Sequence, residues 1–319
     1  MQSGTQIEFN SLFSATFNKA NFMKANLLTA LSCLPESLQS HVLPMISRAD
    51  FKGIIYAEDV DLLQLHSALE TPELLLSLLP LAAAYSVAPI SNFNVGAIAR
   101  AGSGNLYFGA NYEFKHQALF NSVHAEQAAI NNAFSHHESS ILDITVTDSP
   151  CGHCRQFMNE LHCAPTLSVN LKATGVKTLA TLLPDSFGPI DLGISESLLA
   201  AKPVNLTLQQ ENASSLVQVA LQAANTSYAP YSHCHAGIAL KTTTGTVITG
   251  RYIENAAFNP SLSPLQSVLI NLNLAGFALT DIEAMILVEK AETKMSHAQA
   301  TQVLVSEMGI NNYQHFFAQ

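Results

Sequence analysis

Two short segments contain side chains that can bind a metal ion and move a proton. His124 and Glu126 stand two residues apart in Val-His-Ala-Glu-Gln, and Cys151 and Cys154 stand three apart in Pro-Cys-Gly-His-Cys. Inside a helix, residues two apart point to nearly opposite sides, because each residue turns about 100°. In the first turn of a helix, however, both side chains can converge on a point beyond its end. We therefore expect His124 and Glu126 to begin a helix and to face one shared site.

The cysteines also suit the start of a helix. Residues at positions i and i+3 lie on one face, and the positive end of the helix dipole stabilises thiolates. Two thiolates from Cys151 and Cys154 and the neutral imidazole of His124 provide three ligands for Zn²⁺ and leave its fourth position open. An open position is typical of a catalytic zinc site, whereas a structural site has a fourth protein ligand. Taken alone, Cys-x-x-Cys leaves metal-binding, redox and structural roles open.

Glu126 supplies what such a zinc site needs to do chemistry. Zinc lowers the pKa of a bound water to roughly 7, so hydroxide forms at neutral pH. We predict that Glu126 takes up the released proton and passes it on as a general acid and base. His-x-Glu followed by Pro-Cys-x-x-Cys, here completed by Pro150, is the signature of zinc deaminases. Each half is weak alone, and the combination is specific.

Composition indicates a globular protein and excludes several classes of partner. The 319 residues are 48% hydrophobic and 12% charged, with a net charge of −10. No cluster of Lys and Arg is present, so we expect neither nucleic acid nor membrane as a partner. We also expect a cytoplasmic location, because the first residues do not resemble a signal peptide and the five cysteines suit a reducing compartment.

The order of predicted elements indicates a layered α/β architecture. Hydrophobic spacing predicts helices over residues 7–66, with breaks at Pro35 and Pro44, and Thr71 is the expected N-cap of a further helix. Strands and helices then alternate, as in layered α/β folds. Strands are predicted at 94–100, 106–113 and 141–147, and helices are predicted to start near 123 and 151.

The second half of the chain repeats the first. Ala-Pro-Ile-Ser-Asn-Phe-Asn-Val-Gly, which ends at Gly96, resembles Ala-Pro-Tyr-Ser-His-Cys-His-Ala-Gly, which ends at Gly237. In each copy a second glycine follows 13 residues later, at Gly109 and Gly250, and a glutamate follows four residues after that. We therefore predict three parts: a helical N-terminal segment over 1–70, a catalytic domain over 71–190, and a degenerate second domain over 204–319.

The two copies differ at the residues that could do chemistry. Ser263 stands where His124 stands in the first copy, and Leu265 stands where Glu126 stands. The second copy has no Pro-Cys-x-x-Cys. A chemical site that is present in one copy and absent from the other explains these differences together. We expect the second domain to lack a metal site and to have a structural role.

These motifs resemble those of the cytidine deaminase family, in its long dimeric type with a degenerate second domain. The resemblance runs from about residue 72 to the C-terminus. It implies a three-layer α/β/α core duplicated in tandem, with one Zn²⁺ per chain. It also implies hydrolytic deamination of cytidine and deoxycytidine to uridine and deoxyuridine, a step of pyrimidine salvage. The motifs that carry it are Ser91-Asn-Phe-Asn-Val-Gly-Ala97, Phe108-Gly-Ala-Asn-Tyr-Glu113, Val123-His-Ala-Glu-Gln127, Pro150-Cys-Gly-His-Cys-Arg-Gln-Phe157 and Glu254-Asn-Ala-Ala-Phe-Asn-Pro260.

The same resemblance assigns substrate-binding residues. It implies that the pyrimidine packs on Phe93, that Asn111 and Glu113 hold the ribose hydroxyl, and that the backbone at Ala125 orients the base. Phe187 resembles an aromatic residue that reaches the active site of the partner chain. Two copies in each of two chains would rebuild the four-unit assembly of single-domain relatives, so a symmetric homodimer is implied. Without this context Phe93 would be a core residue and Glu113 an ordinary charge at a strand end.

Two rival hypotheses remain at this stage. The same chemistry could act on polynucleotides, but the acidic charge and the lack of a basic groove argue against it. Alternatively, the zinc could stabilise a binding protein that performs no reaction. A structural zinc site needs no proton shuttle, so Glu126 beside three ligands favours catalysis. Arg155 is a further hypothesis: its guanidinium could hydrogen-bond a ligand thiolate.

Overall fold

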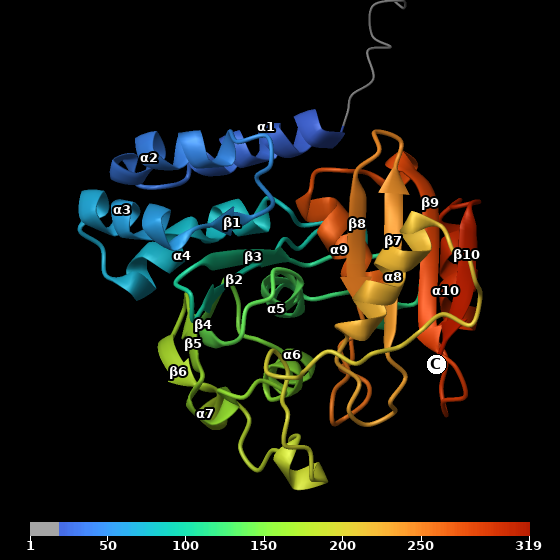
Figure 1. Ribbon diagram of the computed structural model, residues 1–319. Coiled ribbons are helices and arrows are strands. Elements are labelled where there is room, and N and C mark those ends of the chain that lie inside the picture. Colours follow the sequence, from blue (N-terminus) through green and yellow to red (C-terminus); the bar gives the residue numbers. More distant parts are fainter. Residues whose placement is uncertain (1–18) are drawn as a thin grey trace, which may run out of the picture.

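The computed structural model describes residues 19–319, which form two mixed β-sheets with helices packed on them (Figure 1). The first sheet has the strand order β1-β3-β2-β4-β5-β6, and the second has the order β10-β9-β7-β8. The predicted α/β class and its duplication are confirmed. The strands of the first sheet are β1 (Ile54–Ile55), β2 (Gly96–Ala101), β3 (Leu106–Ala110), β4 (Ile141–Val146), β5 (Ser168–Leu171) and β6 (Gly175–Thr178). Those of the second are β7 (Ala236–Thr242), β8 (Val247–Arg251), β9 (Ile282–Lys290) and β10 (Tyr313–Ala318).

Both sheets have the same central pattern of strands. In the first, β2 pairs antiparallel with β3 and β4, and β4 pairs parallel with β5. In the second, β7 pairs antiparallel with β8 and β9, and β9 pairs parallel with β10. The repeat that the sequence predicts is therefore a repeat of structure. Strands β1 and β6 extend the first sheet alone.

The repeated glycines lie where helices approach the sheets most closely. A Cβ on Gly96 would come within 2.5 Å of the backbone of α4 (Thr71–Ala83), and a Cβ on Gly109 within 2.1 Å of the backbone of α5 (Ala125–Ser135). Gly109 pairs with Ala97, the residue after Gly96, so the two glycines face opposite sides of the sheet. Helices α4 and α5 therefore cover opposite faces, which gives the α/β/α layering.

The same contacts recur in the second copy. A Cβ on Gly237 would come within 2.3 Å of the backbone of α8 (Ser215–Asn225), and one on Gly250 within 2.2 Å of α9 (Pro264–Leu274). Only a residue without a side chain allows such close approach. The 13-residue spacing of glycines in each copy thus reflects one packing geometry used twice.

Two helices at the centre of the molecule join the copies. Helices α5 and α9 lie side by side between the sheets, and their contacts are reciprocal (Figure 1). Gln127 Nε2 donates to Pro260 O at 3.0 Å, and Gln266 Nε2 donates to Asn121 O at 2.9 Å. Gln127 and Gln266 occupy equivalent positions in the two copies. The copies therefore face each other with approximate two-fold symmetry.

The N-terminal segment packs on the first copy. Helices α1 (Lys19–Leu31), α2 (Glu36–Ile46) and α3 (Ala57–Ser67) contact one another and α4, and β1 pairs with β3 at the edge of the first sheet. The predicted helix over 7–18 lies outside the described residues. Three predictions were wrong in detail. Pro44 lies inside α2 rather than breaking it, and Glu70 rather than Thr71 is the N-cap of α4. Ile54–Ile55 form strand β1 within the segment predicted to be helical, because they pair with β3.

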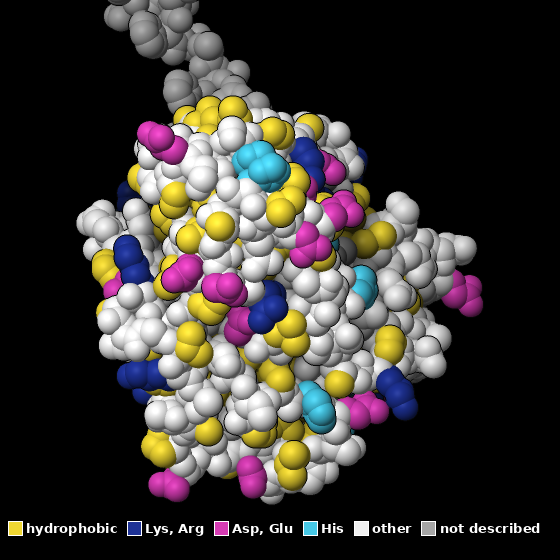
Figure 2. Space-filling model, turned by 90° about the vertical axis from the view of Figure 1, so that its left-hand side faces the viewer, with side chains coloured by type: hydrophobic (Ala, Val, Ile, Leu, Met, Phe, Trp, Pro, Cys, Tyr) yellow, Lys and Arg dark blue, Asp and Glu magenta, His cyan; other side chains and the backbone are white. Residues whose placement is uncertain are grey.

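The remaining helices are α6 (Gly152–Met158), α7 (Leu179–Leu182) and α10 (Ala298–Glu307). One hydrophobic core runs from the N-terminal helices through both copies. Among the described residues, no helix combines the length and the apolar character that crossing a membrane requires. On the face shown in Figure 2, basic side chains lie singly among acidic ones.

Candidate zinc and catalytic site

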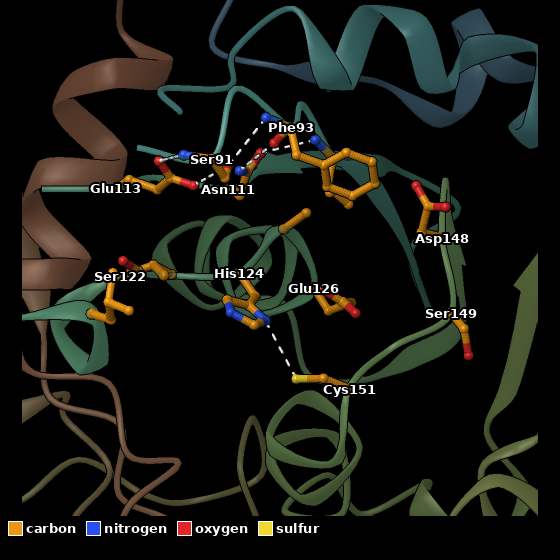
Figure 3. A pocket seen from close by; sticks show the side chains of 14 residues that line it. Ser91, Phe93, Asn111, Glu113, Ser122, His124, Glu126, Asp148, Ser149 and Cys151 are labelled. Atoms are coloured by element: carbon orange, nitrogen blue, oxygen red, sulfur yellow. Dashed lines mark hydrogen bonds between the residues drawn. The ribbon is translucent and has the colours of Figure 1, made fainter. Parts of the chain in front are cut away.

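A pocket of about 370 Å³ opens where α5 and α6 begin, beside the ends of β3 and β4. His124 is the N-cap of α5 and Cys151 is the N-cap of α6. In Figure 3, His124 and Glu126 lie between Phe93 on one side of the pocket and Cys151 on the other. A pocket of this volume is typical of small-molecule sites. Its lining also includes Ser91, Asn111, Glu113, Leu119, Ser122, Ala125, Asp148 and Ser149.

The three predicted ligands converge on one point. His124 Nδ1 lies 3.4 Å from Cys151 Sγ and 3.3 Å from Cys154 Sγ, and the two sulfurs are 3.6 Å apart. Tetrahedral zinc with ordinary bond lengths separates its sulfur ligands by about 3.8 Å and sulfur from nitrogen by about 3.5 Å. The donor set therefore fits Zn²⁺ closely.

The chemistry of the sulfurs also calls for a cation. The hydrogen bond with Cys154, and to a smaller extent that with His124, lowers the pKa of the Cys151 thiol to about 3. The neighbouring Cys151 sulfur and burial together raise the pKa of Cys154. Without a cation Cys154 therefore holds its proton beside the Cys151 thiolate, because two adjacent thiolates repel each other. A zinc ion at this point would remove that conflict.

Glu126 is the second residue of α5 and is only 4% exposed. Burial raises the pKa of its carboxyl group above the usual value, while His124 acts in the opposite direction. A carboxyl group with a raised pKa holds a proton more readily than an ordinary one, which suits a general acid and base. Glu126 thus lies buried in the pocket beside the candidate ligand His124, and its role as a proton shuttle stays a prediction.

Phe93 is presented by a loop that two polar side chains hold in place. Asn111 accepts hydrogen bonds from Ser86 Oγ and Val95 N and donates to Phe93 O at 2.9 Å. Glu113 Oε2 accepts from the backbone N–H groups of Ile90 and Ser91, and its Oε1 accepts from the Ser91 hydroxyl. Phe93 itself is 54% exposed at the pocket wall.

These hydrogen bonds also determine the charge of Glu113. Burial acts to raise its pKa, but the hydrogen bonds from Ser91 and Ile90 outweigh that effect and lower it. Glu113 therefore remains an anion that can accept a further hydrogen bond inside the pocket. Asn111 and Glu113 support the loop that presents Phe93, and both also line the pocket.

Two residues that the sequence singles out, Phe187 and Arg155, do not line the pocket. Phe187 is 47% exposed and does not line the pocket of its own chain, and its carbonyl accepts hydrogen bonds from Gln156 and Asn159. The hypothesis that Arg155 donates to a thiolate was wrong. Its guanidinium donates to Pro150 O, Leu182 O and Ser149 Oγ, and so fixes the start of α6 through the backbone.

Sequence reasoning assigned no role to seven residues that line the pocket: Ser91, Val95, Leu119, Ser122, Val123, Asp148 and Ser149. Asp148 and Ser149 stand directly before Pro150, between β4 and the first cysteine, so their position in the motif could have identified them. Ser91 lies within a motif that the sequence identifies, but its bond to Glu113 needs two segments to meet. Leu119 and Ser122 lie in the loop before His124, and no pattern of residue types marks them.

The second copy fills the equivalent space with side chains. Tyr252, at the position of Asn111, donates its hydroxyl to Glu254 at 3.2 Å and packs edge-on against His297. Cys234, at the position of Phe93, is buried and donates to Met295 O. Within residues 19–319, His124, Cys151 and Cys154 are the one group of ligating side chains close enough to hold a metal ion.

The donor set and the fold define a zinc-dependent deaminase. Two models of the cytidine and deoxycytidylate deaminase zinc-binding region match the chain, over residues 69–169 and 179–302. The second match falls on the copy that lacks the ligands, which agrees with a duplicated fold and a single site.

Relatives along the whole chain are more specific. A cytidine deaminase of Photobacterium profundum is 49% identical over 90% of this chain and 96% of its own length. One from Aliivibrio fischeri is 50% identical over 88% of this chain and 93% of its own. A solved cytidine deaminase of Mycobacterium leprae is 32% identical over 36% of this chain and 99% of its own, with a TM-score of 0.33. The chain belongs to the cytidine deaminase family.

Proposed function

We propose that this protein catalyses the hydrolytic deamination of cytidine and deoxycytidine to uridine and deoxyuridine, with release of ammonia. The observation that carries the proposal is the meeting of three zinc ligands and the buried Glu126 in one pocket, opposite the ring of Phe93. The reaction adds water at the ring carbon that bears the amino group. A C–O bond forms there and the C–N bond breaks.

In this proposal His124, Cys151 and Cys154 hold one Zn²⁺ per chain. When bound, the ion acts as a Lewis acid that makes water nucleophilic at neutral pH. Glu126 removes a proton from the attacking water and delivers it to the ring nitrogen next to the reacting carbon. It then carries a second proton to the departing amino group. The raised pKa of this buried carboxyl group suits it to both transfers.

The other pocket residues bind and orient the nucleoside in the proposal. Phe93 stacks on the pyrimidine, and the backbone at Ala125, at the start of α5, orients the base. Glu113, as an anion, accepts a hydrogen bond from a ribose hydroxyl, and Asn111 donates one to the ribose from its side-chain amide. The lining contains Glu113, Glu126 and Asp148 but no Lys or Arg, so it suits an uncharged nucleoside better than a phosphorylated one.

We also propose that the active unit is a homodimer, in which Phe187 of each chain reaches toward the site of the other. Support comes from apolar side chains exposed on the molecule near the pocket and near Phe187. Phe120 and Ile190 are 83% and 82% exposed, as is usual for residues that a partner covers. The division into 1–70, 71–190 and 204–319 and a cytoplasmic location remain part of the proposal, and the five free cysteines fit a reducing compartment.

The direct test is turnover of cytidine and of deoxycytidine by the zinc-loaded chain, followed by the loss of ultraviolet absorbance and by the ammonia released. We expect both nucleosides to be converted and single-stranded polynucleotides to be left intact. Zinc-loaded protein that leaves both nucleosides unchanged would contradict the proposal, although the metal site and fold would stand.

A further inference from the structure

Helix α6, which carries both cysteine ligands, is too short to hold its own position. It has seven residues, and helices of that length are not stable in isolation. Within the first domain Arg155 ties it to Pro150 O at 2.8 Å and to Leu182 O at 2.7 Å. The positions of the two sulfurs must therefore depend on what else contacts this helix.

The second domain contacts α6 along one side. His153 Nε2 lies 3.2 Å from Asn259 O, and Asn255 Nδ2 donates to Gln156 O at 2.9 Å. The third contact is to Glu160, just beyond the last turn. Positions 153, 156 and 160 recur at intervals of three and four, so they share one side of the helix.

Glu160 makes the most extensive of these contacts. Its Oε1 accepts the hydroxyl hydrogens of Tyr228 at 2.8 Å and Tyr231 at 2.5 Å, and its Oε2 accepts the N–H of Ala256 at 3.0 Å. The side chain is fully buried, and all three donors belong to the second domain. A buried carboxylate requires such donors, because leaving it without hydrogen bonds is unfavourable.

Glu254 fixes the backbone at Tyr231, so that the Tyr231 hydroxyl can reach Glu160. Its Oε2 accepts from Tyr231 N at 2.7 Å and Ser232 N at 3.0 Å. Glu113 makes the equivalent pair of bonds in the first copy, to Ile90 N at 2.8 Å and Ser91 N at 3.0 Å. The second copy thus keeps the glutamate although it has no metal site.

Tyr231 lies in this retained turn and makes the contact with the first domain. It occupies the position of Ile90, so the same backbone turn that supports the pocket wall in the first copy presents a tyrosine hydroxyl in the second. That hydroxyl crosses the domain boundary to Glu160.

We propose that the second domain positions the zinc-binding helix through a clamp, defined as Glu160 together with Tyr228, Tyr231 and the N–H of Ala256. Glu160 is a positioning residue: it touches neither metal nor substrate, and it fixes α6 so that Cys151 and Cys154 stay at ligand distance from His124. The inference rests on the metal ligands named in the proposed function. It assigns the second domain a role within the chain, separate from any role in dimerisation.

The test measures how firmly the full-length, zinc-loaded chain holds its metal. Zinc transfer to a chromophoric chelator is timed for wild type, Tyr231→Phe and the double variant Tyr228→Phe/Tyr231→Phe. Both changes remove hydroxyl donors and keep the ring volume. We expect transfer to be about tenfold faster in the double variant, the size of effect usual for outer contacts of a metal site, and less accelerated in the single variant.

Asn273→Ala is the matched control. Asn273 is 4% exposed and donates across the domain boundary to Tyr85 O at 2.8 Å, away from α6. It should lose stability comparably but keep the wild-type rate of zinc transfer. Cobalt substitution provides a second measurement. The thiolate-to-cobalt absorption bands should shift in the double variant and not in Asn273→Ala.

Equal zinc transfer rates and unchanged cobalt bands in the double variant and the control would overturn the clamp. If the double variant does not fold, Tyr231→Phe and Glu160→Gln decide the question by the same two measurements. Neither reading uses turnover. A chain that fails to deaminate cytidine would therefore leave the clamp testable, and a failed clamp would leave the deaminase proposal intact.

Discussion

The starts of α5 and α9 occupy equivalent places in the two copies, yet they are built for different purposes. Helix α9 begins with Ser263, whose hydroxyl accepts from Gln266 N at 3.2 Å, followed by Pro264 and the buried Leu265. Each is a favourable choice for its position: a capping hydroxyl, a proline at the first turn and an apolar core residue. Nothing at this helix start needs explanation beyond stability.

Helix α5 lacks these stabilising residues at its start. His124 replaces the capping serine and turns its Nδ1 toward two sulfurs, and Glu126 replaces the core leucine at 4% exposure. A buried carboxyl group and a weaker cap each destabilise a helix start. The comparison teaches that the second copy shows what this fold prefers, and that the differences in the first copy mark its chemistry.

The largest effect is expected from a change at Glu126, whose equivalent in the second copy is Leu265. Glu126→Gln keeps the shape of the side chain but removes proton transfer, so kcat for cytidine should fall by about 10²- to 10⁴-fold. Steady-state kinetics and zinc content measured together check this, and zinc content should not change. As a control, Glu283→Gln removes an exposed carboxylate from the second copy and should leave kcat unaltered. Activity near wild type in Glu126→Gln would mean that another group moves the proton.

The filled site of the second copy should make folding sensitive to acid. Burial lowers the pKa of His297 to about 4, although Glu289 opposes the shift. The unfolded chain, with an ordinary histidine pKa of about 6.5, then binds more protons between these two values. This residue's contribution to stability is therefore complete above about pH 6.5 and is lost progressively as pH falls toward 4, by about 3 kcal/mol in all.

His297→Phe tests this, because it keeps a ring against Tyr252 but cannot be protonated. Chemical unfolding at several pH values between 7 and 4 should show a shallower loss of stability in the variant than in wild type. Acid release of the metal is common to both and cancels in the comparison. His162→Phe, at an exposed histidine, is the control and should follow wild type. Parallel curves for His297→Phe and wild type would show that His297 does not titrate as its burial implies.

A single substitution can make the pocket of the first copy resemble the equivalent space of the second copy, which side chains fill. Asn111→Tyr introduces the residue of the second copy, removes the bonds to Val95 and Phe93, and places a ring in the pocket. We expect kcat/KM to fall by roughly tenfold to a hundredfold, which corresponds to about 1–3 kcal/mol. The reverse change, Tyr252→Asn, should leave kcat/KM unchanged. If both variants kept wild-type kinetics, the pocket would not be the nucleoside site.

The smallest expected effect is on the helix cap. In metal-free protein, His124→Ser should raise the free energy of unfolding by about 1 kcal/mol, because a serine can accept from the N–H of Gln127 as Ser263 does from that of Gln266. Ser263→His should lower it by a similar amount. Urea unfolding of the three chains without zinc checks both signs. A loss of stability in His124→Ser would show that His124 contributes more to the fold without metal than a cap would.

The central site could be predicted because its parts are local motifs. His124 and Glu126 share one turn, Cys151 and Cys154 share another, and helix starts bring such residues to a helix end. The two glycine pairs likewise predicted the duplication before any contact was known. Residue type and spacing were sufficient wherever the relevant neighbours lie within a few positions along the chain.

Features that join distant segments could not be predicted. Glu160 reads as an ordinary polar residue after a helix, and its partners Tyr228 and Tyr231 lie 68 and 71 positions away. Position in the sequence suggests a thiolate partner for Arg155, whereas its guanidinium donates to Leu182 O in α7. Pro44 predicts a break in the helix, but it lies within α2. For Glu160 and Arg155 the three-dimensional packing, not the local pattern, decides the partner.

The measurement that tests the central claim most directly is the zinc content of the purified full-length chain, beside Cys154→Ser prepared in the same way. One zinc per wild-type chain and almost none in the variant is the predicted result, because one copy has the ligands and the other has Ser263 and Leu265 in place of His124 and Glu126. Two zinc ions per wild-type chain, or a full equivalent retained in Cys154→Ser, would contradict the division between a catalytic copy and a structural one.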